Sequence, residues 1–151
     1  MITALDHVQL AAPPGSEAML RAFYGDILQM AELPRPAELA GRGGCWFAAD
    51  GGRVRLYLGI EDAFRPTTKA HPGLAVDGID DFAGRLETSG ALVVWDTSLP
   101  PNRRFYTQDP VGNLLEFVEQ QPAQTPGQQP AQQPAPTATQ PTDSSKEPSY
   151  S

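Results

Sequence analysis

An internal repeat constrains this chain more than any other feature of its sequence. The first half predicts a strand, a helix and three further strands, at residues 2–12, 16–29, 30–33, 44–49 and 53–60. The second half predicts the same order, at residues 71–76, 79–88, 92–95, 104–108 and 113–119. Two consecutive βαβββ units predict an α+β fold of two repeats. We expect a curved mixed sheet, with helices on one face and the other face open as a cup.

Local signals mark the ends of several of these elements. Ser16 is predicted as a helix N-cap, and Glu17 follows it in the first turn, where the helix dipole favours an anion. Asp50-Gly51-Gly52 predicts a hairpin turn between two strands. The sole cysteine, Cys45, has no base partner visible in the sequence, so we interpret it as a buried packing residue.

Composition divides the chain near residue 120. Seven of the 16 prolines follow Gln121, in a stretch whose only aromatic residue is Tyr150. Such a segment has too few apolar side chains to offset the entropy lost on ordering. We therefore predict one globular domain at residues 1–120 and a disordered Gln/Pro/Ala-rich tail at residues 121–151.

The net charge and the cysteine content indicate which binding partners and which cellular compartment to expect. The net charge of −7 disfavours nucleic acid, because affinity for phosphate backbones depends on Lys and Arg. A single cysteine cannot form an internal disulfide and suits a reducing compartment. Residues 1–6 contain no basic region and no long apolar run, so the sequence shows neither a signal peptide nor a membrane span. We expect a cytoplasmic protein that binds neither nucleic acid nor membrane.

Strand alternation places the two histidines of the chain on the open face. Val8 and Leu10 belong to the packed face of the first strand, so His7 and Gln9 face the cup. The same alternation assigns His71 and Glu116 to the open face of the second repeat. Two imidazoles and a carboxylate form a ligand set for Fe(II), Mn(II), Ni(II) or Zn(II). A single histidine on a strand is more simply a solvated residue, but the matched positions in the two repeats favour metal ligands.

Four motifs carry a resemblance over about residues 1–120. They are Leu5-Asp6-His7-Val8-Gln9-Leu10, Phe23-Tyr24 with Leu28, His71 followed by Leu74-Ala75-Val76-Asp77, and Asp109-Pro110-Val111-Gly112-Asn113 leading to Glu116. With these motifs the chain resembles the vicinal oxygen chelate (VOC) superfamily, which includes glyoxalase I, methylmalonyl-CoA epimerase, fosfomycin-resistance enzymes, extradiol dioxygenases and bleomycin-binding proteins. Gln29 stands where the family usually has glycine.

The resemblance implies a divalent metal held by His7, His71 and Glu116. A fourth family ligand, usually Glu, Gln or His, falls on the strand that here carries Arg55 and Tyr57. Arginine cannot bind a metal because its guanidinium stays protonated, and tyrosine could do so only as a phenolate. The sequence leaves open which of the two occupies the fourth position, and either is a departure from the family pattern.

The resemblance also implies a function class. We expect a metal-dependent enzyme of the lyase, isomerase or dioxygenase type that acts on a small oxygen-rich or anionic molecule, with Glu116 as a catalytic residue. The predicted substrate pocket contains Gln9, Arg55, Tyr57 and Arg104. A homodimer is the common arrangement of single-domain relatives, and the cup can form within one chain or between two.

Two other functions stay open at this point. A metal-free protein that sequesters a small molecule, as bleomycin-binding relatives do, would explain Arg55 or Tyr57 at the fourth ligand position. A domain that only dimerises or docks through its tail would need neither a ligand nor a metal. The sequence does not choose a reaction class, since one scaffold hosts many chemistries.

Overall fold

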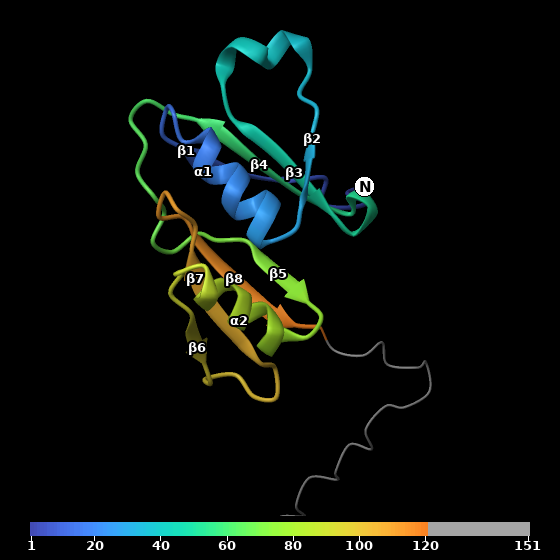
Figure 1. The fold of residues 1–151 in the computed structure, drawn as a ribbon. Helices are drawn as coiled ribbons and strands as arrows, with labels where there is room; N and C mark the ends of the chain where they lie inside the picture. Colours follow the sequence, from blue (N-terminus) through green and yellow to red (C-terminus); the bar gives the residue numbers. More distant parts are fainter. Residues whose placement is uncertain (121–151) are drawn as a thin grey trace, which may run out of the picture. The chain divides into compact units, whose positions relative to one another are not determined.

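A computed structural model describes residues 1–120, and the predicted disordered tail lies outside them. The described chain contains two mixed sheets of four strands each (Figure 1). The strands of the first sheet are β1 (Val8–Ala12), β2 (Ala31–Leu33), β3 (Cys45–Ala49) and β4 (Val54–Ile60). Those of the second sheet are β5 (Gly73–Val76), β6 (Val94–Asp96), β7 (Arg104–Gln108) and β8 (Leu114–Glu119).

The predicted duplication is confirmed by the strand order. The first sheet runs β1-β4-β3-β2 and the second runs β5-β8-β7-β6, so the two orders correspond strand by strand. In each repeat the first strand lies at one edge and pairs in parallel with the last strand, whereas the remaining pairs are antiparallel. The predicted α+β fold of two repeats is confirmed, and the hydrogen bonds within residues 1–120 divide its mixed strands into two sheets of four.

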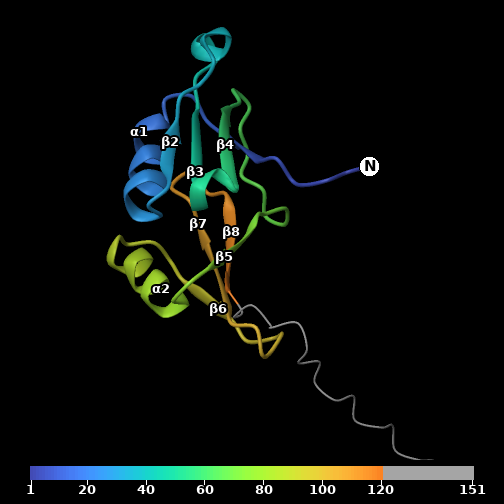
Figure 2. The same cartoon turned by 90° about the vertical axis from the view of Figure 1, so that its right-hand side faces the viewer.

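Each repeat has one main helix that lies against a face of its own sheet (Figure 2). The first begins as α1 (Glu17–Leu20) and continues as the π-helix η1 (Arg21–Ile27), and the second is α2 (Ile79–Thr88). Two short 3-10 helices, η2 (Ala37–Arg42) and η3 (Asp50–Gly52), flank β3. Ser16 occupies the N-cap position, but its hydroxyl does not cap the helix. It donates to the Pro13 carbonyl at 2.7 Å, because Ser16 has α-helical backbone angles.

The end of the first helix explains the departure at Gln29. The Met30 amide donates to the Tyr24 carbonyl at 3.0 Å, which turns the chain sharply after η1. This turn puts Gln29 at a φ of 59°, in the left-handed region. A left-handed conformation strains an L-residue by about 1–2 kcal/mol, which is why glycine is the usual residue after a helix. Gln29 therefore adopts a backbone conformation that favours glycine.

Three strands differ from their predicted boundaries. β1 begins at Val8 and β5 begins at Gly73, so both histidines lie just before their strands and outside the regular hydrogen-bond ladders. β6 covers Val94–Asp96 instead of residues 92–95, and Leu92 is 74% exposed. Strand ends carry few ladder bonds, so alternation alone defines them poorly.

The core forms where the helices cover the sheets. Its largest fully buried side chains alternate along the strands as predicted, and they include Phe47, Leu56, Leu58, Phe105, Leu115 and Phe117. Cys45 is fully buried among them, which confirms its packing role. Because these side chains point toward the helices, their neighbours along each strand point to the opposite, open face.

Buried polar bonds connect the two repeats. The Tyr24 hydroxyl donates to Asp109 Oδ2 at 2.8 Å, and the Asn113 amide donates to the Ala11 carbonyl at 2.9 Å. Asp109 also accepts bonds from the Asn113 backbone amide at 2.8 Å and from the Asn113 side chain at 2.9 Å. The Asp109–Asn113 motif therefore closes its own loop and joins the second repeat to the first.

The buried Tyr24 makes the stability of the fold sensitive to alkaline pH. Burial foremost, and then the Asp109 carboxylate, raise the pKa of Tyr24 well above its ordinary value of 10.0. The folded state therefore favours the neutral phenol, and this contribution to stability is lost as the pH rises above 10. We expect Tyr24→Phe to flatten the alkaline decline in the free energy of unfolding, measured by urea titration between pH 8 and pH 11. An unchanged slope would contradict this expectation.

Candidate functional site

The open face of the second repeat holds a cluster around Glu116. Leu115 and Phe117 are buried under α2, so Glu116 projects from the other face of β8. His71 Nε2 lies 3.3 Å from Glu116 Oε2, and the Arg104 guanidinium donates to Glu116 Oε1 at 2.7 Å. The side chains of His71, Arg104 and Glu116 are only 22%, 16% and 13% exposed, so the cluster is largely shielded from solvent.

A backbone carbonyl fixes the His71 ring. His71 Nδ1 lies 2.7 Å from the Lys69 carbonyl oxygen, which can only accept a hydrogen bond. Nδ1 therefore carries a proton, and the 3.3 Å contact between Nε2 and Glu116 Oε2 needs a second proton between the two atoms. The bond from Nδ1 is the usual arrangement of a histidine that binds a metal, in which the second ring nitrogen donates to an oxygen.

The first repeat holds a second cluster, around His7. His7 Nδ1 lies 2.9 Å from Asp6 Oδ2, which leaves Nε2 of the neutral ring unprotonated. The hydrogen bond from His7 foremost, with the charge of Arg55 assisting, lowers the pKa of Asp6 below its ordinary value of 3.8. Arg55 donates to Asp6 Oδ1 at 3.4 Å and to the Gly52 carbonyl at 3.0 Å. Asp6 is thus an ionised acceptor that orients the ring.

One chain does not bring the three predicted metal ligands together. His71 and Glu116 are in contact, whereas His7 belongs to the cluster of the first repeat. Within residues 1–120 of a single chain, no group of three or more His, Cys, Asp or Glu side chains could hold a metal ion. Of the predicted pocket residues, Arg104 lies in the cluster of the second repeat, and Arg55, Tyr57 and Gln9 lie on the first sheet.

The strand register shows which residue of the first repeat corresponds to Glu116 of the second. In the second sheet, Gly73 of β5 pairs with Glu116, and His71 precedes Gly73 by two residues. In the first sheet, Gln9 of β1 pairs with Tyr57, and His7 precedes Gln9 by two residues. Tyr57 is therefore the counterpart of Glu116 in the first repeat, and Arg55 is not.

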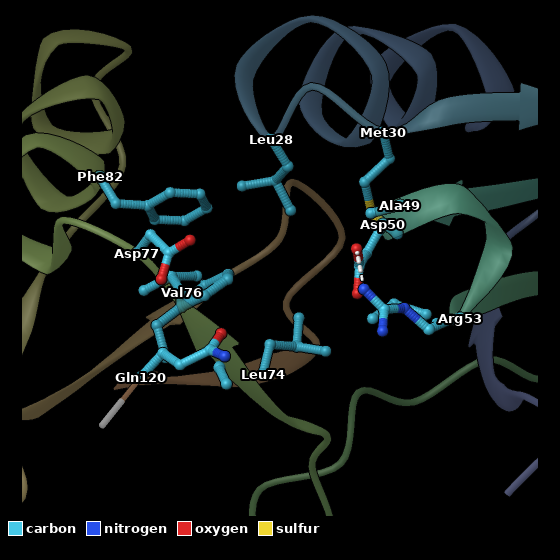
Figure 3. A pocket seen from close by; sticks show the side chains of 13 residues that line it. Leu28, Met30, Ala49, Asp50, Arg53, Leu74, Val76, Asp77, Phe82 and Gln120 are labelled. Carbon is cyan, nitrogen blue, oxygen red and sulfur yellow. Dashed lines mark hydrogen bonds and ion pairs between the residues drawn. The ribbon is translucent and has the colours of Figure 1, made fainter. Parts of the chain in front are cut away.

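Two cavities lie near the sheets, and they differ in chemistry. One of about 450 Å³ lies between the end of η1, α2 and the strands β4 and β5 (Figure 3). Its walls are mainly apolar, with the Asp50–Arg53 ion pair of 2.7 Å on one side, and contain no histidine. The other, of about 400 Å³, follows the free edge of β1 and is lined by Gln9, Arg65 and His71 among others. Only the second cavity includes predicted site residues.

The sequence analysis did not predict three groups that contact the site residues. Asp6 belongs to the first motif, and its position next to His7 could have predicted that it accepts a hydrogen bond from the ring. Tyr106 lies two residues after Arg104 on β7, so alternation could have placed its hydroxyl near Glu116, 3.4 Å away in the structure. The Lys69 carbonyl could not have been found, since it depends on the course of a loop.

No helix within residues 1–120 has the length and apolar character needed to cross a membrane. The sequence matches no protein-family profile and no curated protein. The fold, however, matches many solved structures.

A glyoxalase family protein from Bacillus anthracis is 45% identical to this chain, with a TM-score of 0.76 over 80% of this chain and 98% of the other. The fosfomycin resistance protein FosX from Listeria monocytogenes, solved with Mn(II) and 1S,2S-dihydroxypropylphosphonic acid, is 16% identical, with a TM-score of 0.67 over 80% and 95%. Lactoylglutathione lyase from Agrobacterium tumefaciens is 19% identical, with a TM-score of 0.55 over 74% and 91%. The last two likenesses concern the fold alone.

Proposed function

The chain belongs to the glyoxalase family of the VOC superfamily, and from this premise we propose that it is a metal-dependent enzyme acting on a small oxygen-bearing molecule. The proposed ligands are His7, His71 and Glu116. The proposed ion is one of Fe(II), Mn(II), Ni(II) and Zn(II), and FosX, a protein of the same fold, has been solved with Mn(II).

The orientation of the two imidazoles carries this proposal. Both histidines direct Nδ1 at an oxygen acceptor, Asp6 for His7 and the Lys69 carbonyl for His71. His7 therefore presents Nε2 as its free nitrogen, and His71 directs Nε2 at the Glu116 carboxylate, so both Nε2 atoms are placed to bind an ion. Two neutral imidazoles and one carboxylate form a facial set that leaves coordination positions open for a substrate. The donor set fits a divalent ion.

We place the centre between two copies of the chain. His7 of one protomer would join the partner subunit's His71 and the partner subunit's Glu116, because one chain keeps these residues in separate clusters. β1 and β5 each lie at one edge of their sheet, where a second copy of the chain could approach them. The segment before His7 supports it, since Met1, Ile2 and Leu5 are apolar and 116%, 96% and 77% exposed. A homodimer would cover this segment.

The ion and the side chains of the chain would have different roles in the reaction. A bound divalent ion supplies a Lewis acid that holds substrate oxygens and stabilises negative charge developing on them. Glu116 supplies the anionic ligand and is oriented by a hydrogen bond from Arg104, with Tyr106 as a second donor. Gln9 and Arg65 line the cavity beside His71 and supply polar groups that bind a small substrate. The low exposure of the cluster excludes bulk water from Glu116.

Metal content is the direct test of this function. We expect the purified wild-type chain to retain near-stoichiometric metal by elemental analysis, and the His71→Ala and Glu116→Gln variants to retain at least tenfold less. Glu119→Gln is the matched control, since Glu119 lies on the same strand and pairs with Arg103 at 3.7 Å instead of His71. Equal metal content in Glu116→Gln and Glu119→Gln would reject the metal centre.

A second candidate function rests on the Arg104–Glu116 bond. Arg104 balances the charge of the Glu116 carboxylate at 2.7 Å, and Tyr57 stands in the first repeat where Glu116 stands in the second. A protein that sequesters a small molecule without metal would have both features. Ligand binding that is unchanged by dialysis against a chelator would favour this function over the enzyme.

A further inference from the structure

The first repeat carries an aromatic stack at the place where the second repeat carries a carboxylate. The Tyr57 ring lies parallel to the His7 ring, with centroids 4.4 Å apart and planes 19° apart. The opposite face of Tyr57 lies against Trp46 on β3, with centroids 4.2 Å apart and planes 10° apart. Three rings thus form a continuous stack on the first sheet, with Tyr57 in the middle.

Strand pairing sets up this stack. Trp46 pairs with Tyr57 across β3 and β4, so both side chains leave the same face of the sheet side by side. His7 lies just before β1, whose Gln9 pairs with the same Tyr57. Trp46 and Tyr57 are therefore anchored by regular strands, whereas His7 has no ladder bonds and depends on its side-chain contacts for orientation.

Tyr57 and Asp6 restrain His7 in different ways. Asp6 holds one nitrogen at 2.9 Å, which leaves the ring able to swing about that bond. Tyr57 covers one face of the ring and opposes that swing. The His7 side chain is 39% exposed, so few other groups restrain it.

The second repeat uses the corresponding positions differently. Tyr106, which pairs with Glu116 as Trp46 pairs with Tyr57, meets His71 edge-on, with centroids 5.5 Å apart and planes 85° apart. There the central position holds Glu116, which contacts His71 through an oxygen 3.3 Å away. One repeat therefore offers a carboxylate beside its histidine, and the other offers a ring face.

We propose that Tyr57 is a positioning residue, which holds the His7 imidazole by stacking and does not coordinate the metal. This inference rests on the proposed function and specifies its centre. The ion has three protein ligands, and the site of the fourth family ligand serves to orient one of them. The phenol hydroxyl is dispensable for metal binding, whereas the aromatic ring is not.

Replacing Tyr57 by Phe and by Leu separates these two roles. Phe keeps the ring and removes the oxygen, and Leu keeps apolar bulk and removes the stack, so neither leaves a large void. We expect the Mn(II) dissociation constant of Tyr57→Phe to stay within about twofold of wild type, and that of Tyr57→Leu to rise about tenfold. An equal loss in both variants would overturn the inference, since it would identify the phenol oxygen as a ligand. An unchanged affinity in Tyr57→Leu would also overturn it.

A metal-free measurement distinguishes the failure of this inference from the failure of the proposed function. In the apo protein, the ring currents of Tyr57 and Trp46 should displace the His7 ring-proton resonances. We expect this displacement to persist in Tyr57→Phe and to vanish in Tyr57→Leu, with the His71 resonances as the internal control. If wild type bound none of Fe(II), Mn(II), Ni(II) and Zn(II), the proposed function would fail, and the role of Tyr57 in metal binding would fail with it. If wild type bound Mn(II) but the His7 resonances were identical in all three proteins, only the stacking role would be rejected.

Discussion

Mixing two inactive variants is expected to restore metal binding that neither has alone. His7→Ala keeps His71 and Glu116, and His71→Ala keeps His7, so a mixed dimer contains one site with all three ligands. Random reassociation makes half of the dimers mixed, and each has one intact site of two, so we expect about a quarter of the wild-type metal content. The measurement is elemental analysis after joint unfolding and refolding of equal amounts of the two chains.

The control for this experiment is a mixture that cannot complement. His71→Ala and Glu116→Gln remove ligands from the same cluster, so every mixed dimer from this pair lacks a ligand in both sites. We expect this mixture to bind no more metal than either variant alone. If both mixtures stayed empty while wild type bound metal, the site would lie within one chain, and the repeats would have to rearrange to bring His7 to His71.

Removing the Asp109 carboxylate is expected to produce the largest loss of stability. Asp109 is 4% exposed, and its two oxygens accept bonds from the Tyr24 hydroxyl, from the Val111 and Asn113 amides and from the Asn113 side chain. Asp109→Ala would leave these donors buried without partners, at a cost of about 3–5 kcal/mol in the free energy of unfolding. Urea unfolding monitored by tryptophan fluorescence measures this loss.

Two further variants make the Asp109 prediction specific. Asp109→Asn keeps one acceptor oxygen and nearly the same shape, so we expect it to lose about half as much as the alanine variant. Asp62→Ala is the control for the loss of an exposed carboxylate, and we expect a change within about 0.5 kcal/mol. Equal stability of Asp109→Ala and wild type would show that the bonds between the repeats do not stabilise the fold.

The sequence predicted the repeat and its faces well, because both depend on short-range periodicity. The alternation of Leu115, Glu116 and Phe117 reports directly which side chain faces the core. The same rule assigned Arg55 and Tyr57 to the open face, but it could not choose between them as the counterpart of Glu116. That choice depends on the pairing of β1 with β4, which joins residues far apart in the sequence.

The assembly of the site could not be predicted from residue order. Both histidines occupy matched positions in the repeats, and this symmetry suggested that they would meet. Whether they do depends on how two separately hydrogen-bonded sheets are placed, which no local pattern encodes. Arg104 illustrates the same limit, since it was expected to face an anionic substrate and instead donates to Glu116 at 2.7 Å.

The hydrogen bond between Arg104 and Glu116 bears on whether the chain folds before it binds a metal ion. In small zinc domains the ligands are not held in place without the ion, so folding waits for the metal. Here the guanidinium balances the carboxylate within the chain itself. If the proposed metal centre exists, we therefore expect the chain to fold without the ion and to bind and release it in the folded state.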